Sequence, residues 1–142
     1  MKRRLALLLA AVAAATAAGA TRAAGVPGFT GCRSFVSPSA VAVVRPRSIV
    51  IACADANFYV TGLRWTRWDA RRAAGTGTGH ENDCTPYCAA GHFHTYRVAL
   101  RLDVVARCGA RKEPQFTRVT WTFVGPKPSG AARSGSETFR CA

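Results

Sequence analysis

An even set of cysteines constrains this chain more than any other feature. The six positions are Cys32, Cys53, Cys84, Cys88, Cys108 and Cys141. In a small exported protein such a set predicts a disulfide framework, because thiols that leave the cytoplasm meet oxidants and a small domain gains stability from cross-links. The sequence does not choose among the many possible pairings. Spacing favours a short loop closed by Cys84 and Cys88 around Pro86. Cys32 would then join Cys141 near the two ends, which leaves Cys53 for Cys108.

The first twenty residues have the layout of a secretory signal. A basic start at residues 2–4 precedes an uncharged run rich in Ala, Leu and Val, and residues 18–20 form an Ala-Gly-Ala cleavage site. The run is weakly apolar and shorter than the roughly 20 strongly apolar residues of a spanning helix. We expect residues 1–20 to be a cleaved signal peptide. The mature chain should have no transmembrane segment and be secreted, either free outside the cell or associated with its envelope.

The chain is strongly basic. Its net charge is +13, and removal of the three basic residues in the signal leaves 13 − 3 = +10. A cationic exported domain is attracted to anionic wall polymers and lipid head groups, and salt screens this attraction. We therefore expect anionic cell-wall polymers or a membrane surface as partners, and no nucleic acid.

The middle of the chain is rich in strand patterns. The candidate segments are 40–44, 48–54, 57–68 with a bulge at Gly62, 95–107 and 116–124. In the segment 95–107, apolar Tyr96, Val98, Leu100, Leu102 and Val104 alternate with mostly charged residues. Such alternation predicts a strand with one face on a core and the other in water.

Glycine, proline and serine mark the remaining segments. We predict a flexible N-terminal segment at 21–39, a long loop at 74–91 with room for a short strand in its first half, and a Pro/Gly/Ser-rich C-terminal tail at 126–142. The β domain then spans 40–125. The fold class expected for it is all-β, a small disulfide-stabilised antiparallel β-sandwich or open barrel.

One stretch concentrates the residue types that bind metals. Cys84, Cys88, His92 and His94 follow closely after His80. An exported cysteine pair with three residues between is more often oxidised than bound to zinc, and neighbouring histidines often only donate or accept hydrogen bonds. We predict no metal site and no cofactor, while the sequence leaves open whether His80, His92 and His94 bind a metal.

The sequence contains no recognisable catalytic motif. It lacks G-x-S-x-G and H-E-x-x-H, and the export context disfavours a free thiol nucleophile. We predict a non-enzymatic protein with no catalytic residues. One alternative is a cell-wall or glycan hydrolase that uses the loop carboxylates Glu81 and Asp83. Another is a secreted proteinase inhibitor that displays the loop clamped by Cys84 and Cys88.

Arginine and tryptophan are interleaved in the segment 63–72. Arg64, Trp65, Arg67 and Trp68 are the candidate binding residues, because exposed indole rings and guanidinium groups stack on sugars, lie at membrane interfaces and grip anionic polymers. The structural alternative places Trp65 and Trp68 on opposite faces of a strand, where one ring serves the core and the other an edge.

Three motifs carry a resemblance. They are C-A-D-x-N at 53–57, W-x-x-W at 65–68 and N-D-C-x-P-x-C-A-x-G at 82–91. Over roughly residues 46–124 the chain resembles an uncharacterised family of small secreted actinobacterial proteins. The resemblance implies secretion and a shared domain, and it implies no activity, cofactor or catalytic residue. Here the tryptophan pair is followed by Asp-Ala-Arg-Arg, which makes this copy more basic.

Overall fold

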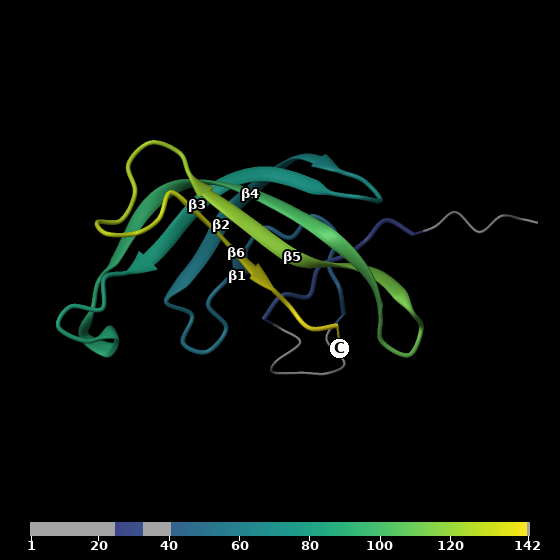
Figure 1. Cartoon of the computed structure of the whole chain (residues 1–142), viewed down its shortest axis with the longest axis horizontal. Coiled ribbons are helices and arrows are strands. Elements are labelled where there is room, and N and C mark those ends of the chain that lie inside the picture. The colour runs from purple at the N-terminus through teal and green to yellow at the C-terminus, as the bar shows by residue number, and fades with distance from the viewer. Residues whose placement is uncertain (1–24, 33–40, 142) are drawn as a thin grey trace, which may run out of the picture.

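The computed structural model describes residues 25–32 and 41–141 as one antiparallel sheet in which each strand lies beside its neighbour in sequence (Figure 1). The strands are β1 (Ile49–Val50), β2 (Phe58–Trp68), β3 (Ala73–Asn82), β4 (Phe93–Cys108), β5 (Glu113–Phe123) and β6 (Ser134–Thr138), with a short 3-10 helix η1 at Cys88–Ala90. The sheet curls into a half-barrel, which confirms the all-β, open-barrel prediction. The expected signal peptide, 1–20, lies outside the described residues, as do 21–24 and 33–39 of the expected N-terminal segment.

The hydrophobic core lies on the inner side of the curl. In Figure 1 the purple and blue segments, 25–32 and 41–57, lie under the arched sheet. Alternate residues of the strands point to that side and are buried, among them Val60, Val98 and Leu102. Phe29 from the N-terminal segment packs edge-on against Phe139 from the end of the chain, with ring centroids 5.2 Å apart. The two ends of the domain thus close the open side of the half-barrel.

The segment predicted as a loop contains a full strand of the sheet. β3 pairs with β2 along one side and with β4 along the other. Its inner face carries only alanine and glycine from Ala73 to Gly79, so this part of the strand fits closely under its neighbours. A Cβ placed on Gly77 would lie 2.7 Å from the carbonyl oxygen of Thr61, and one on Gly79 would lie 2.6 Å from Val98. The alternation of glycine inward and threonine outward is therefore a strand pattern, although its composition is typical of a loop.

The predicted C-terminal tail also belongs to the sheet. β6 pairs with β5 from Ser134 to Thr138, and Phe139 directly after it is buried. At the other end, Gly28 and Phe29 form isolated bridges to Gln115 and Val43. The predicted domain limits, 40 and 125, are therefore too narrow, because chain ends with few apolar residues still complete the core.

Short apolar runs near the start of the domain form less strand than predicted. Among the described residues of the segment 40–44, which are 41–44, only Val43 makes a bridge, and in 48–54 only Ile49 and Val50 join the sheet. The prediction of Val104 as an inward residue is also wrong. Its φ is 56°, and the pairing register skips it between Asp103 and Val105, so its side chain is exposed.

Three disulfides tie the described chain together. They join Cys32 to Cys53, Cys84 to Cys88 and Cys108 to Cys141. Of the pairings favoured by spacing, only the short loop is present. Such cross-links are consistent with an extracellular protein. No helix within the described ranges is long and apolar enough to cross a membrane.

Candidate functional site

The side of the sheet opposite the core is polar, and we call it the outer face. It is formed by Tyr59, Thr61, Arg64 and Arg67 of β2; Ala74, Thr76, Thr78, His80 and Asn82 of β3; Phe93, Thr95, Arg97, Ala99, Arg101 and Asp103 of β4; Arg118, Thr120 and Thr122 of β5; and Ser134, Ser136 and Thr138 of β6. Hydroxyl groups and guanidinium groups make up most of this list. The outer face can therefore donate many hydrogen bonds over a broad surface.

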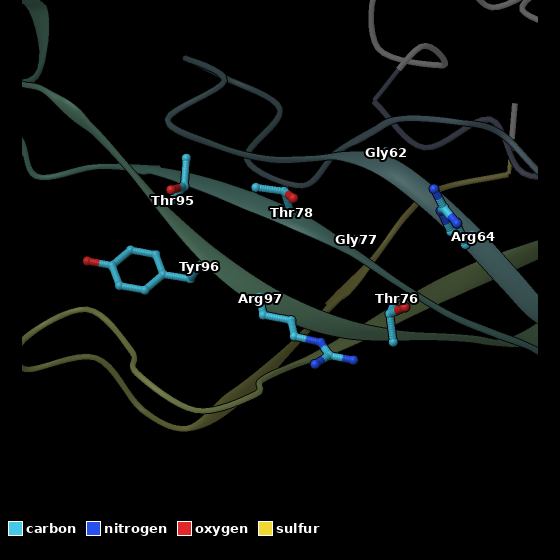
Figure 2. Close-up of a pocket in the computed structure, with 8 residues that line it drawn as sticks. All are labelled: Gly62, Arg64, Thr76, Gly77, Thr78, Thr95, Tyr96 and Arg97. Atoms are coloured by element: carbon cyan, nitrogen blue, oxygen red, sulfur yellow. The ribbon is translucent and has the colours of Figure 1, made fainter.

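A shallow depression of about 420 Å³ lies in the outer face where β2, β3 and β4 run side by side (Figure 2). Its lining consists of Gly62, Arg64, Thr76, Gly77, Thr78, Thr95, Tyr96 and Arg97. Figure 2 shows the ring of Tyr96 directed away from the guanidinium of Arg97. Tyr96 packs inward on Phe123, with centroids 5.6 Å apart. The side chains free to meet a ligand are thus those of arginine and threonine.

A bulge in β2 shapes this depression. Gly62 has a φ of 61°, and the register with β3 shifts between Thr61 and Arg64. A residue without a Cβ adopts this left-handed conformation at little cost. The extra residue keeps Leu63 in the core and returns Arg64 to the outer face. The predicted bulge at Gly62 is confirmed.

Strand register brings the depression's polar groups together. Thr61 lies opposite Thr78, and Thr78 lies opposite Arg97. Two residues away along β3, Thr76 lies opposite Arg64. Neighbouring strands are about 4.8 Å apart. One extended ligand could therefore touch two guanidinium groups and several hydroxyls at once.

Five arginines of the strands lie on the outer face, and two of them share the carboxylate of Asp103. Asp103 binds the Nε of Arg118 at 2.6 Å and a terminal nitrogen of Arg101 at 3.2 Å. The hydrogen bond from Arg118, followed by the charge of Arg101, lowers the pKa of Asp103. Arg64 and Arg97 are exposed and take part in none of the ion pairs found within 25–32 and 41–141. The depression therefore holds two positive charges without a counter-ion from the described chain.

The outer face has a second depression further along the sheet. It measures about 350 Å³ and is lined by Arg101, Arg118, Thr120, Ser134, Gly135 and Ser136. Its arginines are the two that share Asp103. The same combination of hydroxyl and guanidinium thus recurs along the sheet.

Both predicted binding tryptophans point to the inner side. The indole N–H of Trp68 donates to the carbonyl of Pro27 at 2.9 Å, and that of Trp65 donates to Pro46 at 2.8 Å. Their rings meet edge-on at 4.7 Å. A second register shift in β2, between Trp65 and Arg67, turns both rings to the same side, so the prediction of opposite faces is wrong.

The predicted arginines separate as well. Arg67 is exposed and pairs with Asp69, whose pKa is lowered to about 2, chiefly by the backbone N–H of Arg71 and then by Arg67. Arg64 alone among the four predicted residues lines the depression. A binding role for Arg64, Trp65, Arg67 and Trp68 stays a prediction.

The three histidine rings do not converge on one point. His80 stacks on Tyr59 and hydrogen-bonds Thr61 at 2.8 Å, whereas His94 pairs with Asp83 at 2.9 Å. The backbone N–H of His92 donates to the same aspartate. Among the residues that the structure describes, no three His, Cys, Asp or Glu side chains are grouped to hold a metal ion.

The two loop carboxylates lie in different environments. Asp83 accepts N–H donors from His92 and Thr85 and pairs with His94, and these bonds lower its pKa well below the ordinary range. Burial raises the pKa of Glu81 at the end of β3. The adjoining ring closed by the Cys84–Cys88 disulfide leaves Tyr87 64 % exposed.

Sequence reasoning missed most of the residues that line the depression. Thr76, Thr78, Thr95 and Arg97 were not among the predicted binding residues, although the alternation of glycine and threonine at 75–79 was a readable signal for a strand with hydroxyls on one face. Arg97 lies in β4, the strand with the clearest alternation of apolar and polar residues. That alternation does not predict which residue of β3 lies opposite Arg97, so its position beside Thr78 could not be inferred from the sequence.

Comparisons of the chain with protein-family models, with curated proteins and with solved structures found no match. The resemblance to small secreted actinobacterial proteins therefore stays a prediction.

Proposed function

We propose that this protein is an exported, non-enzymatic domain that binds anionic polymers of the cell envelope through its outer face. The observation that carries the proposal is the arrangement of Arg64 and Arg97 around the threonines of the central depression, where no carboxylate of residues 25–32 and 41–141 pairs with them. Guanidinium groups bind carboxylate and phosphate in a forked geometry, and hydroxyls add hydrogen bonds around them.

The open shape of the sheet, the disulfides and the net charge of the domain support this role. An open sheet face lets a long polymer pass over it, whereas an enclosed site would admit only its end. Three disulfides suit a protein that works outside the cell. The net charge adds a general attraction that brings the protein to an anionic surface before the outer face engages.

Retention on isolated cell walls tests the proposal. The exported protein is mixed with purified walls at low and at high salt, and the bound fraction is measured after sedimentation. We expect Arg64→Gln with Arg97→Gln to lower the apparent affinity by about tenfold or more, since two charge-assisted contacts are lost. The matched control, Arg71→Gln with Arg72→Gln, removes the same charge from the β2–β3 turn and should have a much smaller effect.

Three results would overturn this proposal. The first is no retention of the wild-type protein at low salt. The second is an equal loss in both double variants, which would show that net charge alone governs binding. The third is retention on anionic vesicles and not on walls, which would identify a membrane surface as the partner.

One observation favours a second candidate function, the hydrolysis of wall glycans. Glu81 and Asp83 are two residues apart and their pKa values are shifted in opposite directions, by burial and by hydrogen bonding. A glycosidase needs one protonated and one ionised carboxyl group. This candidate predicts that wild-type protein releases soluble sugar from walls and that Glu81→Gln abolishes the release without loss of binding. Walls that release no sugar would reject it.

A further inference from the structure

An aromatic cluster adjoins the arginine-lined depression on the outer face. The ring of His80 stacks on Tyr59 with centroids 4.6 Å apart, and Phe93 contacts Tyr59 at 5.4 Å. Phe93 is 47 % exposed. The hydrogen bond between His80 and Thr61 fixes the imidazole in place. The cluster is thus a rigid, partly exposed ring surface at one end of the outer face.

The sheet register sets the aromatic cluster next to the polar groups. Tyr59 lies opposite His80, which lies opposite Thr95. Two residues further along the same strands, the corresponding row is Thr61, Thr78 and Arg97. A strand rises about 3.3 Å per residue, so the two rows are about 7 Å apart. Rings, hydroxyls and guanidinium groups therefore follow one another along the path of a single extended ligand.

This sequence of groups matches the chemistry of an acidic sugar polymer. The C–H face of a sugar ring packs on an aromatic side chain, while its hydroxyls exchange hydrogen bonds with threonine. An acid group on the next unit would pair with an arginine fork. A simple polyphosphate gains nothing from Phe93, and a lipid surface gains little from a row of threonines.

We propose that the outer face binds an acidic polysaccharide, with a sugar ring on Phe93 and Tyr59 and an acid group at Arg97 and Arg64. The inference rests on the proposed function, because it uses the same face, and it adds the class of polymer and the place of each group. The rings are held in position before binding, which lowers the entropy lost when the polymer docks.

Binding to defined polymers tests this inference with the exported, disulfide-bonded protein. The probes are polygalacturonate, its fully methyl-esterified form and inorganic polyphosphate, and affinities are measured by calorimetry at one fixed salt concentration. We expect polygalacturonate to bind at least about tenfold more tightly than the neutral ester. Phe93→Ala should weaken polygalacturonate binding by about tenfold, a typical cost of losing one stacking contact, and leave polyphosphate binding unchanged.

Two further variants are compared with Phe93→Ala: one is a control for the loss of an exposed ring, and the other removes a charge from the depression. Tyr87→Ala removes another exposed aromatic ring, in the clamped loop, and should leave polygalacturonate binding unchanged. Arg97→Gln should weaken binding of both polyanions, because it removes a charge that either could use. Circular dichroism spectra that match the wild type verify that each variant is folded.

The outcomes separate this inference from the proposed function. If Phe93→Ala leaves polygalacturonate binding unchanged while Arg97→Gln weakens it, the sugar inference is wrong and the anionic-polymer function stands. Retention on walls without binding to polygalacturonate also overturns the inference alone. If walls, polygalacturonate and polyphosphate all fail to bind, both proposals fall.

Discussion

The two faces of the same sheet have opposite chemistry. On the inner face, β4 contributes Val98, Leu100 and Leu102, all buried. On the outer face the intervening residues of β4 include Arg97 and Arg101, both exposed. A strand sends successive side chains to opposite sides, so one stretch of sequence serves both faces.

Because the two faces differ, the side chains that stabilise the fold are not those that we propose to bind a ligand. Removal of an inner side chain leaves a cavity, whereas removal of an outer one mainly changes what the surface can touch. Changes on the inner face should therefore lower the free energy of unfolding, and changes on the outer face should alter ligand affinity with little effect on folding. Four predictions test this difference between the faces, and they are given in order of decreasing effect.

Leu102→Ala should have the largest effect. Leu102 is completely buried between Ala73 of β3 and Val119 of β5. The truncation should lower the free energy of unfolding by about 2–5 kcal/mol, measured by urea denaturation with disulfides intact. Thr120→Ala on the outer face of the adjacent strand is the control, with an expected change of about 0.5 kcal/mol or less. Equal losses in the two variants would show that inner and outer side chains contribute equally to stability.

Removal of the Cys108–Cys141 disulfide should come next. This cross-link closes a segment with a sequence separation of 33 and holds the end of the chain, with buried Phe139, against the core. Replacement of both cysteines by alanine should cost about 2–4 kcal/mol. The same replacement at Cys84 and Cys88, whose separation is only 4, should cost less by the same denaturation assay. The opposite order would show that the short loop, and not the chain end, secures the fold.

Gly79→Ala would place a methyl group on the crowded inner face of β3. The new Cβ would lie 2.6 Å from Val98 and 3.3 Å from Phe58. We expect a loss of about 1–3 kcal/mol, because two buried side chains must shift. Thr78→Ala, the neighbouring residue on the outer face, is the control for thermal denaturation. An unchanged melting temperature for Gly79→Ala would mean that β3 does not pack as closely as the structure shows.

Acid should destabilise the folded protein by a smaller amount, through the loop carboxylate of Asp83. Hydrogen bonds from His92, His94 and Thr85 depress the pKa of Asp83 in the folded protein below its ordinary value of 3.8. The stabilisation is therefore present above pH 4 and is lost as the pH falls through the folded-state value. Asp83→Asn should flatten the pH dependence of the melting temperature between about pH 4 and pH 2. Leu102→Ala should shift that curve without changing its shape.

Part of this fold could be predicted because strand patterns are local. The alternation in β4 and β5 and the bulge at Gly62 were visible in the sequence, and the structure confirms them. Glycine favours turns in isolation, so the sequence predicts a loop at 74–91 with room for only a short strand, although the small size of glycine is what the crowded strand β3 requires between its two neighbours. β6 was missed for a related reason, since Ser134–Thr138 is a polar edge strand held by β5.

The candidate site was harder to predict. Trp65 and Trp68 were singled out by composition, yet each indole N–H has a backbone carbonyl partner inside the fold. A single register shift in β2 decides which way these rings point. Local sequence does not specify that shift, because it depends on how β2 pairs with β3.

Local sequence was enough to predict the alternation and charge of single strands, and the even number of cysteines in the chain was enough to predict disulfides. The partners were set by the folded chain: Cys32 meets Cys53, and Arg97 lies in one row with Thr78 and Thr61. The physical reason is that alternation follows from the geometry of one strand, whereas neighbours across a sheet follow from long-range pairing around a shared core. The outer face is a product of that pairing.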